Sequence, residues 1–148
     1  MKHVLAIIAA LAVLIVGFNI VQSHAAEPDA AKKYRVVWQV TAKTPEQWEA
    51  MQLNVENFRE SVGAANSEVT VIVHGNGIGM VQTSNAAQAE RMKKLMTEGV
   101  KFMACENTMK RKKISKEEIM PGVGFVDSGV AEVVRLQTDG WAYIKVGE

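Results

Sequence analysis

Beyond residue 33, short runs of β-branched and aromatic residues alternate with longer stretches in which apolar residues recur at helical spacing. The short runs predict five strands, at residues 34–40, 69–73, 100–104, 123–126 and 141–146. The run at 69–73 is almost continuously apolar, which is typical of a strand covered on both faces of a parallel sheet. The pattern therefore predicts a sheet buried between two layers of helices.

The longer stretches carry helix start and stop signals. Thr44 is a predicted cap, Pro45 suits the first helical position, and Gln47 is placed to complete a capping box. Further helices are predicted from Ser84 or Asn85 to Gly99, over the basic segment 109–113, and from Ser128 to Gly140, with residues 74–79 as a loop. This alternation predicts one α/β domain, a three-layer α/β/α flavodoxin-like sandwich with a mainly parallel five-stranded sheet and right-handed crossovers.

The N-terminal segment has the layout of a secretory signal peptide. Lys2 precedes an unbroken apolar run at 4–16, and small residues at Ser23 and Ala25 occupy the positions that a signal peptidase reads. We predict a cleaved signal peptide at 1–25, with cleavage after Ala26 as second choice, a mobile lead-in at 26–33 and the domain at 34–148. A periplasmic or secreted protein, soluble and free of the membrane after cleavage, follows. An uncleaved anchor helix over 4–21 is the alternative.

Composition excludes several classes of protein. The 148 residues are 48% hydrophobic and include one cysteine, so a disordered chain and an internal disulfide scaffold are both excluded. Removal of residues 1–25 takes Lys2 from the 17 basic residues and leaves 16 against 16 acidic ones, which argues against nucleic acid as a partner. Beyond residue 25, His74 is the single histidine and the methionines are scattered, so no metal site and no cofactor are predicted.

The candidate chemistry lies at the carboxyl edge of the predicted sheet, where α/β folds bind their ligands. Cys105 stands where a strand leads into a helix, and the lysine-rich segment 110–113 follows it, so a stabilised, reactive thiolate is one interpretation. A packed structural cysteine is the other. His74, Asn76, Asn107 and Thr108 are candidate binding residues for an anion, although a structural histidine and helix caps explain the same residue types.

Several segments together carry a resemblance to a known family. They are the strand 34–40, the loop His74-Gly75-Asn76-Gly77, the Phe-x-x-Cys-x-Asn-Thr segment at 102–108 and the ending Gly140-Trp141-Ala142-Tyr143-Ile144. The sequence resembles the DsrE-like superfamily, and within it the exported members. This resemblance implies a flavodoxin-like fold, homo-oligomers of three or six chains, and a cysteine, here Cys105, that carries sulfur as a persulfide between donor and acceptor proteins.

One residue departs from the family pattern. Glu106 follows the thiol where glycine is usual in similar sequences, and a carboxylate beside Cys105 disfavours its thiolate. The leading hypothesis is an exported sulfur carrier, a sulfurtransferase-like relay, with a sulfur donor or acceptor protein or a small sulfur anion as partner. The alternative is a noncatalytic oligomeric module that binds a small anion or a partner protein, with Cys105 packed. A third hypothesis is an intermolecular disulfide through Cys105.

Overall fold

A computed structural model describes residues 33–147. The predicted signal peptide at 1–25, and all of the predicted lead-in except Lys33, lie outside the described residues. Within 33–147, no helix is long and apolar enough to cross a membrane.

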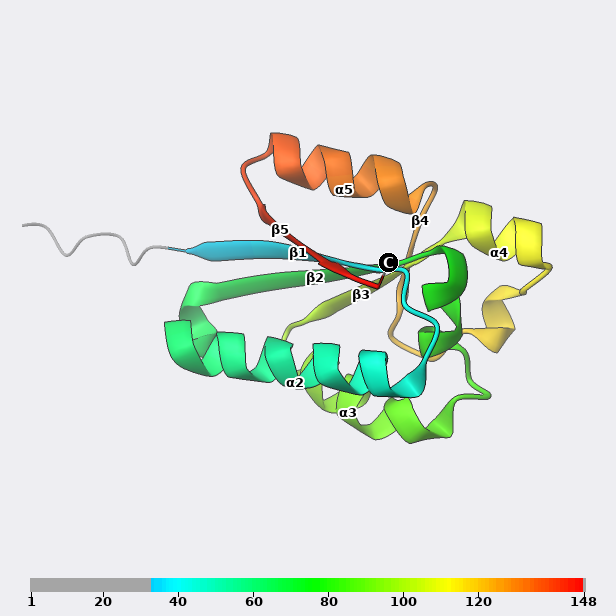
Figure 1. Cartoon of the computed structure of the whole chain (residues 1–148), viewed down its shortest axis with the longest axis horizontal. Helices are drawn as coiled ribbons and strands as arrows, with labels where there is room; N and C mark the ends of the chain where they lie inside the picture. Colours follow the sequence, from blue (N-terminus) through cyan, green and yellow to red (C-terminus); the bar gives the residue numbers. More distant parts are fainter. Residues whose placement is uncertain (1–32, 148) are drawn as a thin grey trace, which may run out of the picture. The chain divides into compact units, whose positions relative to one another are not determined.

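Five parallel strands form one sheet in the order β4-β3-β2-β1-β5. Their bounds are β1 Tyr34–Val40, β2 Ser67–Val73, β3 Lys101–Cys105, β4 Gly124–Val126 and β5 Ala142–Val146. Because every strand is parallel to its neighbours, all five carboxyl ends meet at the same edge, at which loops and short helices gather (Figure 1).

Helices cover both faces of this sheet. The α-helices are α2 Pro45–Val62, α3 Ala86–Thr97, α4 Glu106–Lys112 and α5 Gly129–Thr138. Figure 1 shows α2 and α3 on one side of the sheet and α5 alone on the other. Three short 3₁₀ helices complete the chain: η1 Ala64–Asn66, η2 Gly75–Val81 and η3 Lys116–Glu118. The predicted three-layer α/β/α sandwich is confirmed, with a sheet that is parallel throughout.

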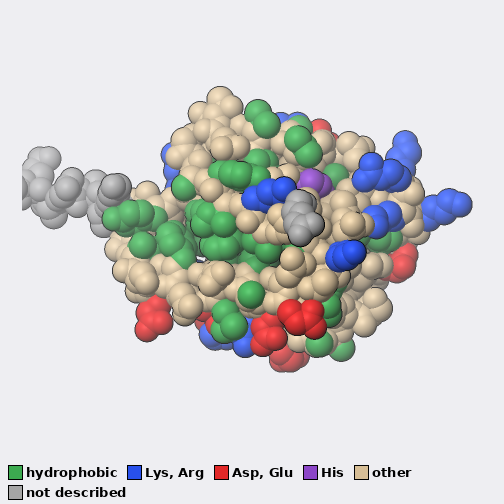
Figure 2. All heavy atoms as spheres, in the orientation of Figure 1, with side chains coloured by type: hydrophobic (Ala, Val, Ile, Leu, Met, Phe, Trp, Pro, Cys, Tyr) green, Lys and Arg blue, Asp and Glu red, His purple; other side chains and the backbone are tan. Residues whose placement is uncertain are grey.

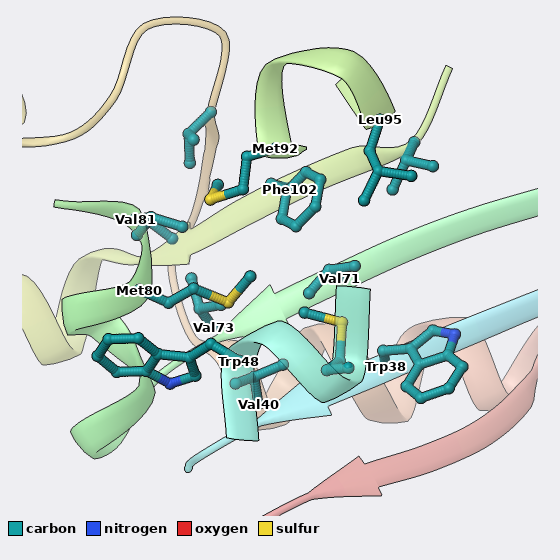
Figure 3. Packing of buried hydrophobic residues seen from close by; sticks show 14 of the residues in the cluster. Trp38, Val40, Trp48, Val71, Val73, Met80, Val81, Met92, Leu95 and Phe102 are labelled. Atoms are coloured by element: carbon teal, nitrogen blue, oxygen red, sulfur yellow. The ribbon is translucent and has the colours of Figure 1, made fainter. Parts of the chain in front are cut away.

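The two faces bury very different amounts of apolar surface. The larger core lies between the sheet and α2 and α3, where Phe102, Met92 and Leu95 pack against the valines of β1 and β2 (Figure 3). The core under α5 contains only four buried residues, Val37, Ile72, Val126 and Val133. Burial of apolar side chains is the main stabilising contribution, so most of the stability of this domain comes from the α2 and α3 face.

The predicted capping residues act as expected at two of the four α-helix starts within residues 33–147. The Thr44 hydroxyl accepts a hydrogen bond from the backbone N–H of Gln47 at 3.4 Å, and Ser128 caps α5 by accepting from the N–H of Ala131 at 3.4 Å. Gln47 does not complete a capping box, because its side chain accepts a hydrogen bond from the Thr44 hydroxyl at 3.3 Å. Asn85 occupies the N-cap position of α3 without a capping hydrogen bond from its side chain.

Two predictions about the carboxyl edge are corrected. The segment 74–79, predicted as a loop, is largely the 3₁₀ helix η2, whose residue Gly77 lies so close to β1 that an added Cβ would be 2.2 Å from the carbonyl oxygen of Val40. The helix predicted to begin at Met109 begins at Glu106, directly after Cys105. The turn between β3 and α4 is therefore tighter than the sequence pattern predicts.

Candidate functional site

Cys105 lies where the chain leaves the sheet in opposite directions from two neighbouring strands. After β3 the chain enters α4, whose Met109 belongs to the larger core, on the face of α2 and α3. After β4 it enters α5, whose Val133 packs on the opposite face. Such switch points open a crevice at the carboxyl edge of parallel sheets, and ligands bind there. The end of β3 is thus where the fold itself favours a ligand.

Hydrogen-bond donors surround the sulfur of Cys105, which is only 4% exposed. The backbone N–H of Gly129, the first residue of α5, donates to Sγ at 3.2 Å. The Thr108 hydroxyl is the neighbouring group that lowers the pKa of Cys105 most, and its oxygen accepts a hydrogen bond from the N–H of Gly75 at 3.1 Å. That bond leaves the O–H proton of Thr108 available for another acceptor.

These donors favour the charged form of the thiol. Burial alone raises the pKa of Cys105, but the hydrogen bonds from the Thr108 hydroxyl, from the Gly129 N–H and from the backbone at Thr108 and Asn107 outweigh burial and lower this pKa below its ordinary value. The thiolate is the nucleophilic form of cysteine. These surroundings favour the charged, nucleophilic form of the Cys105 thiol over its neutral form.

The acidic neighbour Glu106 is paired with a lysine. Its carboxylate forms an ion pair with Lys116 at 2.7 Å. The expectation that Glu106 disfavours the thiolate stays a prediction, and the ion pair reduces the negative charge that this carboxylate presents to the sulfur.

His74 belongs to the same crevice but contacts the sulfur site indirectly. The His74 side chain packs directly against Gly129. A Cβ atom added to this glycine would lie only 3.0–3.2 Å from Cβ, Cγ and Cδ2 of His74. Nε2 of the ring lies 2.7 Å from Nε2 of Gln39 on β1. Burial and the nearby positive charge of Arg111 lower the pKa of His74, so the imidazole is neutral near pH 7.

The two predicted asparagines lie further out. Asn107 has an exposed side chain, while its backbone N–H donates to the carbonyl of Asp127 at 3.2 Å and ties the start of α4 to the end of β4. Asn76 is exposed and accepts a hydrogen bond from Lys112 at 3.3 Å. Asn76 also lines an open cavity of about 640 Å³ with residues 41–44 and Gln47. Of the four predicted binding residues, Thr108 influences the sulfur directly, His74 packs beside Gly129, and the side chains of both asparagines are exposed.

Positive charge surrounds this edge of the sheet. The side chains of Lys110, Arg111, Lys112 and Lys113 are all exposed, and within residues 33–147 none of them forms an ion pair with a carboxylate. Figure 2 shows basic side chains around the α4 end of the molecule, with a histidine surface nearby and acidic side chains along the edge formed by α2 and α3. An anion approaching Cys105 is therefore attracted by charges that no acidic side chain neutralises.

Three important residues of this site escape sequence reasoning. Gly129 contributes a backbone donor, which no side-chain pattern reveals. Gln39 and Tyr143 join His74 in a hydrogen-bonded chain. The sequence held one hint of this chain, because Gln39 is a polar residue inside the otherwise apolar run of β1. Across the described part of the chain, no three His, Cys, Asp or Glu side chains are grouped so as to hold a metal ion.

Comparison with known proteins gives a family and a fold. A model of the DsrE/DsrF-like family matches residues 34–146. No curated protein matches the chain. Among solved structures, a protein of unknown function, MTH1491 from Methanobacterium thermoautotrophicum, is 28% identical with a TM-score of 0.72, over 76% of this chain and 99% of that one. The ychN protein from E. coli has the same fold at 11% identity and a TM-score of 0.64, over 76% of this chain and 98% of its own.

Proposed function

Because the chain belongs to the DsrE/DsrF-like family, we propose that it is an exported sulfur carrier in which Cys105 accepts sulfane sulfur as a persulfide and passes it on. The observation that carries this proposal is the set of neutral donors around the Cys105 sulfur, from Gly129, Thr108 and the start of α4. These donors stabilise a negative sulfur before the reaction, and they are equally suited to a persulfide anion.

The proposed transfer needs no oxidant and no cofactor. The Cys105 thiolate attacks the terminal sulfur of a donor persulfide R–S–S⁻. A new S–S bond forms at Cys105, the S–S bond of the donor persulfide breaks, and R–S⁻ leaves. With thiosulfate as donor, the leaving group is sulfite. An acceptor thiolate then attacks the outer sulfur of the Cys105 persulfide in the same manner. Charge is conserved in each step, and the cationic surroundings favour anionic donors.

Intact-mass spectrometry after incubation with thiosulfate or polysulfide tests the proposal. The native chain is expected to gain sulfur that a thiol reductant removes, and the Cys105→Ser variant is expected to gain none. Serine keeps the size and the hydrogen-bonding capacity of the side chain, so the variant isolates the sulfur atom itself. A chain that gains no cysteine-dependent sulfur contradicts the relay.

Export and assembly form part of the same proposal. We infer a homo-oligomer because the α5 side of the sheet exposes apolar side chains: Val130 and Val134 on α5 are each 57% exposed, and Tyr143 and Ile144 are exposed on the edge strand β5. The family resemblance implies three or six chains. Neither nucleic acid nor a membrane is proposed as a partner of the processed chain. Fractionation of cells and N-terminal sequencing test a periplasmic or secreted location and cleavage after Ala25.

A second candidate function is supported by the cavity beside Asn76. Its lining by residues 41–44 and Gln47, at the start of α2, suits a small anion without covalent chemistry. In that case Cys105, 4% exposed, is only packed. The pH dependence of alkylation of the native chain separates the two functions. Modification well below the ordinary thiol pKa of about 8.5 favours the carrier, and resistance until denaturation favours the binding module.

A further inference from the structure

A chain of three side chains reaches from the exposed edge strand to the sulfur site. Tyr143 on β5 donates its hydroxyl proton to Oε1 of Gln39 on β1. The Nε2 amide of Gln39 then lies 2.7 Å from Nε2 of His74, at the end of β2. Beyond His74 lies Gly129, whose N–H binds the Cys105 sulfur.

The donor and acceptor roles along this series of hydrogen bonds follow from the Tyr143 hydroxyl. When the Tyr143 hydroxyl donates to Gln39, the amide oxygen is the accepting group and the amide nitrogen faces His74. An amide NH₂ has only protons to offer, so Nε2 of His74 must accept. A neutral imidazole carries one proton, and an acceptor at Nε2 leaves that proton on Nδ1. A doubly protonated ring would direct two donors at each other.

We propose that Tyr143 and Gln39 are positioning residues that hold His74 as the neutral Nδ1–H tautomer, so that His74 is neither a general base nor an imidazolium partner for Cys105. The lone pair with which His74 could take a proton is occupied by the Gln39 amide. The thiol is then activated by the neutral donors from Gly129 and from Thr108 and Asn107 at the start of α4, without proton transfer to His74. The role of His74 in sulfur transfer rests on the proposed carrier function, whereas the assignment of its tautomer is independent of that function.

The groups around His74 agree with a neutral ring. Arg111 of α4 brings a positive charge, Gln39 of β1 presents an amide, and Gly129 of α5 presents only backbone. The titratable neighbours are the Tyr143 phenol, joined through Gln39, and the Cys105 thiol, joined through Gly129. No carboxylate on these elements is among the groups that shift the pKa of His74. The ring thus lacks the acidic partner that would favour its charged form.

The direct test is ¹⁵N NMR of the imidazole nitrogens of the full chain, with the His74 signals assigned by their loss in His74→Gln. We expect a protonated Nδ1 and an unprotonated Nε2 across neutral pH. The Gln39→Glu variant presents only acceptors, so it should move the proton to Nε2 and raise the pKa of His74. Gln137→Glu, the same substitution at an exposed position on α5, should leave the His74 signals unchanged.

Three results would overturn the proposal: a wild-type ring protonated at Nε2, a doubly protonated ring at neutral pH, or an unchanged His74 signal in a folded Gln39→Glu variant. A backbone NMR spectrum of each variant establishes that it is folded. The consequence for function is read separately from the rate of sulfur loading against pH. The pH profile of the wild-type loading rate should show one ionisation, that of the Cys105 thiol. The profile of Gln39→Glu should show a second ionisation, that of His74. A chain that never loads sulfur contradicts the carrier function but leaves the tautomer result intact.

Discussion

At the residue scale, the proposed reactivity of Cys105 rests on geometry that places a few neutral donors around one sulfur. A buried thiol in apolar surroundings resists ionisation. Here one donor comes from the start of α5 and others come from the first turn of α4, and together they offset the cost of burying the charged sulfur. Preorganised donors of this kind act most strongly where water is excluded.

The Thr108 hydroxyl provides a direct test of this geometry. Thr108→Val keeps the shape of the side chain and removes the O–H donor. Because a hydrogen bond to a charged group contributes about 1.5–3 kcal/mol, alkylation of Cys105 below its pKa should slow by roughly tenfold or more. Stopped-flow alkylation of the native chain measures this rate, and Thr108→Ser, which keeps the hydroxyl, is the control. Equal rates in the valine and serine variants would show that the hydroxyl does not stabilise the thiolate.

The lowered pKa of His74 predicts how stability changes with pH. In the unfolded chain this histidine takes up a proton near its ordinary pKa of about 6.5, whereas the folded chain resists protonation until lower pH. The unfolded state therefore binds more protons between the two values, and the free energy of unfolding falls as pH drops through this window. His74→Gln should lose less stability over the same pH range, as measured by urea denaturation at several pH values. Parallel curves for the two proteins would contradict the assignment.

At the element scale, the site depends on how closely η2 approaches β1. The close contact of Gly77 with the Val40 carbonyl sets the path of η2, and the N–H of Gly75 at its start orients Thr108. The sequence shows three glycines in this segment, but it does not show which strand they face. The strands and most helix limits were predictable because apolar spacing and capping residues are local signals.

Gly77→Ala tests the coupling between this element and the thiol. The new methyl group would collide with backbone atoms of β1, so η2 must shift, with a loss of stability on the order of 1–3 kcal/mol and slower alkylation of Cys105. Gly79→Ala in the same helix is the matched control, because its Cβ would meet side chains and no backbone: the Trp48 ring at 3.2 Å and Oε1 of Gln82 at 3.9 Å. Denaturation curves and alkylation rates should separate the two variants. Similar behaviour of both would mean that η2 does not position Thr108.

At the scale of the whole molecule, the sandwich was predictable and the composition of the site was predictable only in part. Cys105 and Thr108 stand at the junction of β3 and α4, where local patterns predict the end of the strand but place the start of the helix at Met109 instead of Glu106. Gly129 lies 24 residues away from Cys105, and Tyr143 lies 104 residues away from Gln39. Contacts over such separations depend on strand order and register, which a single sequence does not specify. The ion pair of Glu106 with Lys116 was missed for a related reason, since the path of the chain after α4 decides it.

The unequal cover of the two sheet faces suggests α5 as the interface of the proposed homo-oligomer. Val130 and Val134 lie one helical turn apart on α5 and are largely exposed. A double Val130→Glu and Val134→Glu variant is therefore expected to dissociate the proposed oligomer into single folded chains, because it would place charge in an apolar interface. Leu53→Glu, at an exposed position on α2, is the control and should keep the assembly. Light scattering coupled to gel filtration reads the mass, and an unchanged mass in the double variant places the interface elsewhere.

The most direct test of the carrier function is the rate at which Cys105 gains sulfur from polysulfide in the native chain near pH 7. Intact mass measures the gain over time, and peptide mapping locates it. We expect Cys105 to load sulfur faster in the folded chain than in the same chain unfolded in urea. The reason is that the fold supplies the hydrogen-bond donors that stabilise the thiolate. Loading only after unfolding, or equal loading of Cys105→Ser, would contradict it.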